Sequence, residues 1–135
     1  MIADISHYLS ILSTAIFMLT FSLVLVLDRS ASHATLLIKR SYSHAFILFL
    51  ISFLLYVYLA LTDNFSVSYI AQHSNSLLPN FYKVTSIWSA HEGSMFLWIV
   101  FLSLWGFAFN LHNDSNLNVK NLSIGIISII IVGFQ

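Results

Sequence analysis

The sequence predicts an all-α, polytopic transmembrane protein with three full spans and a partial fourth. Of its 135 residues, 59% are hydrophobic and only 7% are charged, whereas soluble domains carry about a quarter charged residues. A water-soluble core of this size has too little volume to enclose so much apolar surface, so lipid must cover much of it. The apolar residues also fall into separate runs with polar segments between them.

Two long apolar runs predict the first two spans. The first covers residues 8–27, about the 20 residues that a bilayer core requires. No Lys or Arg precedes it, and it is longer than the apolar part of a signal peptide, so we expect it to be retained. Ser10, Thr14 and Ser22 interrupt it at helical spacing and favour close contact with another helix. After a linker, the second run covers residues 44–62.

A polar segment of residues 63–87 comes next and contains the only proline, Pro79. Phe65, Val67 and Tyr69 alternate as in an extended strand, but Phe65 and Tyr69 also fit one turn of helix, so both conformations stay open. The segment has too many apolar residues for a free linker. We therefore expect it to pack against other protein.

The third span is predicted over residues 90–111. Ser89 and Glu92 fit a capping box at its start, with Ser at the N-cap and Glu three positions later. The last run, residues 122–134, would be about 20 Å long as a helix, which is too short for an ordinary bilayer core. We therefore expect either a truncated chain or a second polypeptide that supplies the rest of this crossing.

The basic residues predict the orientation. Four of them lie in the first and third loops and one lies in the second: Arg29, Lys39, Arg40 and Lys120 against Lys83. The positive-inside rule then places the first and third loops in the cytoplasm or matrix. The N-terminus and the 63–87 segment would face the periplasm or the intermembrane space. No basic cluster is present, which argues against a nucleic-acid partner, and the lack of cysteine excludes disulfides and thiolate metal sites.

The segment from Trp88 to Trp98 contains the residues that most favour chemistry. Glu92 is an acid beside a span with no adjoining charged loop, and such acids are functional candidates. His91 next to it has a side chain that titrates near neutral pH. The favoured alternative is structural: Glu92 caps the helix and Gly93 permits close approach of a neighbouring helix.

An aromatic stripe lies on the same predicted helix. His91, Trp98 and Trp105 recur every seven residues, and three further apolar residues share their face: Met95, Leu102 and Phe109. Such a stripe suits a flat cofactor such as haem or quinone, although packing against another helix is the commoner explanation.

The predicted orientation divides the histidines between the two sides. The outer side receives His7, His73 and His91, and the inner side receives His33, His44 and His112. A metal cluster of the outer three is the weaker alternative, because no two of them have the i, i+3 or i, i+4 spacing that a helical metal site prefers. We assign no metal site.

A longer pattern extends across the polar segment and the third span. Its most specific residues are Pro79, Tyr82, Lys83, Trp88, His91, Glu92, Gly93, Ser94 and Trp98. This pattern resembles the N-terminal region of cytochrome c maturation protein F. That family, which includes the nitrite-reductase haem lyase relatives, is the haem lyase subunit of the bacterial and plant-mitochondrial cytochrome c maturation system. The resemblance runs over essentially the whole chain, although Ser89 stands where many relatives have Gly.

The resemblance implies that the chain is the N-terminal part of a haem lyase, truncated or split, in the bacterial inner membrane or alternatively the mitochondrial one. Family members take haem from a haem chaperone and help to join it to the thiols of apocytochrome c. The implied partners are the remainder of the lyase, the haem chaperone, apocytochrome c and its thiol-handling partner. Haem is the implied cofactor, but the family's tryptophan-rich outer motif does not occur in this sequence. We therefore assign no catalytic residue and no haem ligand here, and expect the fragment alone to be inactive.

Two other classes of function stay open. The first is a small transport or proton-path subunit in which Glu92 and His91 relay protons. The second is a non-catalytic assembly subunit, in which both residues are replaceable as long as the helices insert.

Overall fold

The computed structural model describes residues 1–28, 30–89, 91–112 and 116–135, with the side chains of residues 91 and 92 left out of the description. Its four long helices are α1 (Ile2–Val26), α2 (Ser32–Leu61), α5 (His91–Leu111) and α6 (Leu117–Phe134). Each is long and apolar enough to cross a membrane. The described residues contain no strand, and the predicted all-α, multi-span class is confirmed.

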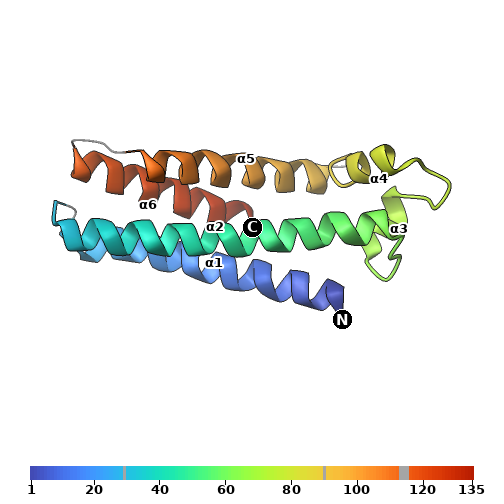
Figure 1. The fold of residues 1–135 in the computed structure, drawn as a ribbon, viewed down its shortest axis with the longest axis horizontal. Coiled ribbons are helices and arrows are strands. Elements are labelled where there is room, and N and C mark those ends of the chain that lie inside the picture. Colours follow the sequence, from blue (N-terminus) through green and yellow to red (C-terminus); the bar gives the residue numbers. More distant parts are fainter. Residues whose placement is uncertain (29, 90, 113–115) are drawn as a thin grey trace.

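The four helices form an up-and-down bundle with two different ends (Figure 1). We call one end the basic end, because α2 and α6 begin there and carry Lys39, Arg40 and Lys120 close to their starts. At the other end, residues 63–89 connect α2 to α5 and include two short helices, α3 (Ser68–His73) and α4 (Asn80–Ser86). We call this segment the cap, and that end of the bundle the cap end.

Three helices are longer at their starts than the apolar runs predicted. Helix α1 begins at Ile2 instead of residue 8. Helix α2 begins at Ser32 instead of residue 44, so the predicted linker is largely helical. Helix α6 begins at Leu117 instead of residue 122, and the Asn116 side chain accepts a hydrogen bond from the Val119 N–H at 3.3 Å as its N-cap. At 18 residues, α6 is about 27 Å long, longer than the 13-residue run predicted, and it is long and apolar enough to cross a membrane.

Hydroxyl groups at seven-residue spacing join α1 to α2. Ser6 donates to the Ser52 carbonyl at 3.0 Å while the Ser52 hydroxyl donates to the Ser6 carbonyl at 2.7 Å. One helix repeat further along, Ser13 donates to the carbonyl of Ala45 at 3.1 Å. These buried hydroxyls bond to the backbone of the neighbouring helix instead of to water. Such interhelical hydrogen bonds commonly join membrane helices.

The three polar residues that favoured helix contact in α1 differ in their hydrogen bonds. The Thr14 and Ser22 hydroxyls donate to carbonyls of their own helix, four residues earlier. Ser10 does reach another helix, because its hydroxyl and its carbonyl both accept hydrogen bonds from the Gln135 side chain, at 2.8 and 3.0 Å. The contact of α1 with α2 through Ser6 and Ser13 was not predicted, because serine spacing alone does not show which face of a uniformly apolar helix is buried.

The cap packs on the last turn of α2. Ile70 of α3 and Ile87 after α4 form a buried cluster with Leu59 and Ala60, so the expected packing of this segment is confirmed. The alternation that left two conformations open resolves as an extended residue, Val67, followed by helix from Ser68.

Candidate functional site

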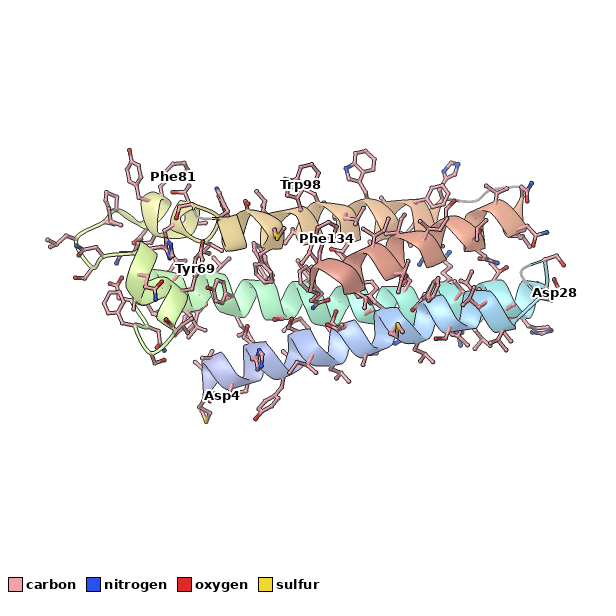
Figure 2. The ribbon with its side chains drawn as sticks, turned by 180° about the vertical axis from the view of Figure 1, so that it is seen from behind. Asp4, Asp28, Tyr69, Phe81, Trp98 and Phe134 are labelled. Atoms are coloured by element: carbon pink, nitrogen blue, oxygen red, sulfur yellow. The ribbon has the colours of Figure 1, made fainter. Side chains whose placement is uncertain are left out.

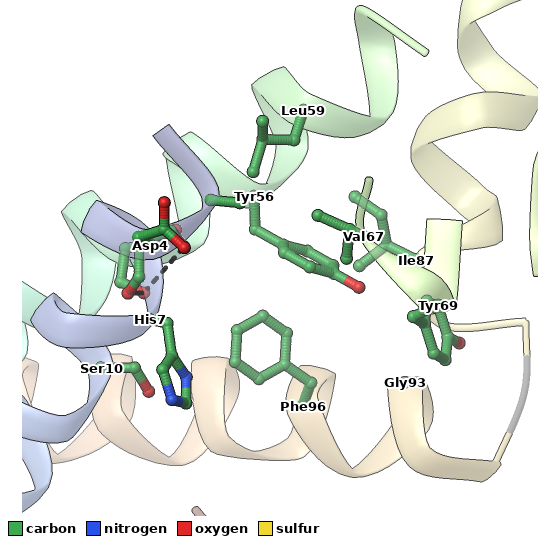
Figure 3. A pocket seen from close by; sticks show the side chains of 13 residues that line it. Asp4, His7, Ser10, Tyr56, Leu59, Val67, Tyr69, Ile87, Gly93 and Phe96 are labelled. Atoms are coloured by element: carbon green, nitrogen blue, oxygen red, sulfur yellow. Dashed lines mark hydrogen bonds between the residues drawn. The ribbon is translucent and has the colours of Figure 1, made fainter. Parts of the chain in front are cut away.

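A cavity of about 460 Å³ lies at the cap end of the bundle (Figure 3). Each of its walls comes from a different part of the chain. His7 lies on α1, Tyr56 on α2, Tyr69 in the cap, and Gly93 and Phe96 on the first turns of α5. The cavity therefore forms only when α1, α2, α5 and the cap assemble.

Aromatic rings line one side of this cavity. The Phe96 ring meets Tyr56 and Phe49 edge to face, at centroid distances of 5.7 and 5.6 Å. Tyr56 lies 6.5 Å from Tyr69, whose ring stacks on His73 at 4.3 Å. Because each ring contacts the next, packing holds the aromatic wall in place.

The polar groups of the cavity lie mainly toward α1. Asp4 is 70% exposed and pairs with the N-terminal amine at 2.8 Å, so this charge pair belongs to the rim. His7 is also exposed and lines the cavity. The Ser6 and Ser52 hydroxyls lie deeper, and each donates to the backbone carbonyl of the other residue. The site thus has a polar rim and an interior of aromatic and hydroxyl groups.

Gly93 allows the cap to approach α5. A Cβ atom at this position would overlap the carbonyl oxygen of Ile87 and the hydroxyl oxygen of Tyr69. The first of these is backbone and has little freedom to move away. The close approach predicted at Gly93 is present, but the partner is the cap and not another spanning helix.

Lys83 has a structural partner in the cap. Its ammonium nitrogen lies 2.6 Å from an Asp63 carboxylate oxygen, and the lysine side chain is 7% exposed. Asp63 has a φ of 53°, in the left-handed region that Asp tolerates better than most residues. The chain turns there at the end of α2, and the ion pair fixes α4 beside that turn.

The other cap residues of the predicted motif fall into two groups. Pro79 is the N-cap of α4, and Trp88 packs against the buried cluster of Leu59 and Ile87. Tyr82, in contrast, is exposed. The motif is therefore spread over the cap and not gathered around one reacting centre.

Ser94 and Trp98 face away from the cavity. They line an apolar groove between α5 and α6 together with Met95 and Leu102. Trp98 is 72% and Trp105 is 74% exposed, and Figure 2 shows Trp98 projecting from the edge of the bundle. Other described helices of this chain leave most of these two side chains uncovered, and packing of the stripe against another helix stays a prediction.

Several predictions concern side chains outside the described residues. They include the Glu92 side of the capping box, the acid–base roles of His91 and Glu92, and the basic residue Arg29. The Ser89 hydroxyl, which is described, donates to the Ser86 carbonyl at 2.9 Å. Among the described residues, no group of three His, Cys, Asp or Glu side chains could hold a metal ion. His73 uses its Nδ1 on the Tyr69 carbonyl at 2.9 Å.

The sequence analysis missed a polar layer at the basic end. The buried Asn110 amide of α5 donates to the Lys39 carbonyl at 2.9 Å and to the Ser43 hydroxyl at 3.2 Å on α2. The Asn121 amide of α6 donates to the Thr35 hydroxyl at 2.8 Å. The sequence feature that indicates this layer is the position of the two asparagines at the ends of apolar runs. An asparagine that faced lipid there would leave its amide unpaired.

This layer also includes a buried lysine. Lys120 is 4% exposed and donates to the carbonyl of His112. Nearby, the Tyr42 hydroxyl donates to the Ser103 carbonyl at 3.1 Å, and the same ring leaves no room for a Cβ at Gly106. These groups hold α2, α5 and α6 together.

Comparison with known proteins gives relatives of one kind. The chain is 47% identical over 75 residues to the cytochrome c-type biogenesis protein NrfE of Haemophilus influenzae, a match that covers 53% of this chain and 12% of that protein. It is 41% identical over 87 residues to CcmF of the same organism, covering 62% of this chain and 13% of the relative. It is 36% identical over 107 residues to CycK of Bradyrhizobium diazoefficiens, covering 78% of this chain and 16% of the relative.

No family model matches the chain, and no solved structure matches it. The matched stretch is 12 to 16% of the length of these three relatives. Together with the four spanning helices, the matches make this a multi-pass membrane protein. The chain is thus related by sequence to the cytochrome c-type biogenesis proteins of the CcmF and NrfE type, over a small part of their length.

Proposed function

We propose that the chain forms part of the membrane region of a cytochrome c haem lyase and contributes to covalent haem attachment to apocytochrome c. The observation that carries this proposal is the relation to CcmF and NrfE proteins, at 36 to 51% identity. The contribution of this chain is a scaffold and the His-Glu-Gly-Ser segment, and the haem ligands come from other parts of the lyase.

The geometry at the cap end supports this assignment. The segment beginning at His91 forms the first turn of α5, and its glycine, Gly93, lines the cavity. A site at the end of a span, between a membrane bundle and an external cap, is accessible to partners outside the bilayer. The haem chaperone and the apocytochrome would approach from this end.

The proposed location is the bacterial inner membrane, with the cap on the periplasmic side. Lys39, Arg40 and Lys120 lie close to the starts of α2 and α6, at the basic end, and the positive-inside rule places such an end in the cytoplasm. A mitochondrial inner membrane, with the cap in the intermembrane space, is the alternative.

The described residues do not supply a complete haem site. Haem held between two axial ligands needs a suitable side chain, usually His or Met, on each face of the macrocycle. His7 is the one histidine among the described residues that line the cavity, and the nearby His73 ring is stacked on Tyr69. We therefore expect the purified chain to give no stoichiometric Soret band after titration with haem. A one-to-one Soret complex would contradict the proposal that other parts of the lyase provide the ligands.

The rival proposal, a proton path through Glu92 and His91, has less support. In the middle of the bundle, buried Phe17, Phe49 and Ile124 fill the core. The described hydroxyls Ser6 and Ser13 are engaged with backbone carbonyls. A proton path through this core would have to pass these apolar side chains.

Disruption of this chain in its native host tests the proposal. We expect covalent haem in c-type cytochromes to fall, as measured by haem staining of denatured membrane proteins. The conservative variant Glu92→Gln separates the alternatives: a proton path predicts lost proton flux with normal cytochrome c. An assembly subunit predicts that both His91→Ala and Glu92→Ala keep normal cytochrome c at wild-type abundance. Unchanged covalent haem in the disrupted strain would reject the lyase assignment.

A further inference from the structure

Three side chains in α4 and the loop just before it are large, apolar and exposed. Leu77, Phe81 and Tyr82 have exposed fractions of 90%, 73% and 57%. The Phe81 and Tyr82 rings lie 5.8 Å apart at a steep angle. A cap immersed in water would place this surface against solvent, which is unfavourable for aromatic and leucine side chains.

Helix α4, which contains Phe81 and Tyr82, lies beside the last turn of α2. The 2.6 Å ion pair between Lys83 and Asp63 brings the two elements together. Ile87 packs on Leu59 and Ala60 in the same place, and Figure 1 shows α4 at the same end of the bundle as the end of α2. The helix is therefore at the level of the end of the span, and not stacked beyond it.

The charges of α2 indicate where the bilayer surface meets this end. Residues 41–61 contain no Asp, Glu, Lys or Arg and rise about 31 Å as a helix, close to the thickness of about 30 Å of a bilayer core. Lys39 and Arg40 then lie at one surface and Asp63 at the other. Because α4 is paired with Asp63, it lies in the interfacial layer.

We propose that Leu77, Phe81 and Tyr82 form an interfacial foot, which inserts into the boundary between lipid headgroups and acyl chains on the cap side of the membrane. Tyr and Phe side chains suit this layer because their rings are apolar and the tyrosine hydroxyl reaches water. Tyr58, near the end of α2, is 51% exposed at the same level. Figure 2 shows Phe81 at the same edge of the molecule as Trp98 of the spanning helix α5. The foot thus continues the lipid-facing surface of the bundle.

Insertion of the foot into the membrane would restrict the movement of the cap. Attachment at Leu77 and Phe81 holds α4 against the membrane from outside, while the Lys83–Asp63 pair holds it from inside. The cap is then fixed on two sides, and so is the wall of the cavity that it provides. This inference concerns the lipid and does not depend on haem chemistry.

Single-cysteine labelling tests the foot, because the natural chain contains no cysteine. The variants Leu77→Cys and Phe81→Cys are labelled with the polarity-sensitive dye NBD in vesicles of phosphatidylcholine and phosphatidylglycerol. Gln72→Cys, at an exposed polar position of the same cap, is the matched control, and Trp98→Cys reports a position within the span. We expect blue-shifted emission at 77 and 81, and at least threefold stronger quenching by shallow spin-labelled lipid than at 72.

The result that would overturn the proposal is equal quenching and equally red emission at positions 77, 81 and 72. That outcome would mean that the foot faces water or a protein partner. A second variant, Phe81→Asp, leaves the Lys83–Asp63 pair in place and is expected to increase protease cleavage of the cap several-fold in vesicles. Unchanged cleavage, with lipid quenching at Trp98→Cys retained as a sign of insertion, would also count against the foot.

Discussion

The two ends of the bundle are held together in different ways. At the basic end, buried amide and ammonium groups of α5 and α6 donate hydrogen bonds to carbonyls and hydroxyls between the helices. At the cap end, the space between α1, α2 and α5 is a cavity closed by the cap. We infer that the basic end stabilises the bundle, and that the cap end is shaped for function and depends on the cap for its walls.

Gly93→Val should break the cap end most strongly. The new side chain would overlap the Ile87 carbonyl and the Tyr69 hydroxyl, so the cap must move off α5. We expect a destabilisation of about 3 kcal/mol, at the upper end for overpacked sites, and loss of most covalent haem in cytochrome c. Detergent unfolding followed by circular dichroism measures the first effect, and haem staining measures the second.

Gly133→Val is the matched control for that substitution. A Cβ atom at Gly133 meets nothing within 4 Å, so we expect stability and haem attachment close to those of the natural chain. Similar losses in both variants would show that valine disturbs these helices generally. The assigned role of Gly93 would then be withdrawn.

Lys83→Met should loosen the attachment of the cap. It leaves the Asp63 carboxylate without its cation, at a site where this side chain is 26% exposed. We expect a loss of about 2 kcal/mol, below the value of about 3–5 kcal/mol for fully buried pairs. The double variant Asp63→Asn with Lys83→Met removes both charges and should recover more than half of the stability. A double variant as unstable as the single one would contradict the ion-pair explanation.

Asn110→Ala should have the smallest of these effects on stability and should spare the cap end. It removes two hydrogen bonds to α2, at 2.9 and 3.2 Å, and bonds of this kind in membrane proteins contribute about 0.6 kcal/mol each. We expect a loss of about 1 kcal/mol in detergent unfolding and unchanged labelling of the cap. Asn118→Ala, at an exposed position of α6, is the control. A cap that becomes more accessible in Asn110→Ala would show that the two ends are coupled.

The sequence predicted the helices well where composition alone decides them. A run such as residues 8–27 has one favourable place, the bilayer core, and both the all-α class and the multi-span organisation follow from that constraint. The starts of α1, α2 and α6 were all predicted too late, those of α2 and α6 because Lys39, Lys120 and Asn121 were taken as loop residues. In the structure these residues lie within helices, and the last two are buried against other helices.

The sequence identified the motif residues of the candidate site but did not predict where in the fold they lie. Gly93 was identified for close approach, yet its partners, Tyr69 and Ile87, belong to a cap whose fold has no periodic signal. His7 and Tyr56 line the same cavity from two other helices, and nothing in their local sequence indicates that they meet. Lys83 was included in the motif without a role, because its partner Asp63 lies 20 residues away in the sequence.

The most direct test of the difference between the two ends fills the cavity without breaking a bond. Ala3 lines the cavity from α1, and Ala15 lies exposed on the same helix. In the native host, at matched membrane abundance of the chain, covalent haem per c-type cytochrome is measured for Ala3→Leu and for Ala15→Leu. Our account predicts a several-fold loss for Ala3→Leu and wild-type haem for Ala15→Leu. Equal haem in the two variants would contradict a role of the cap-end cavity in cytochrome c maturation.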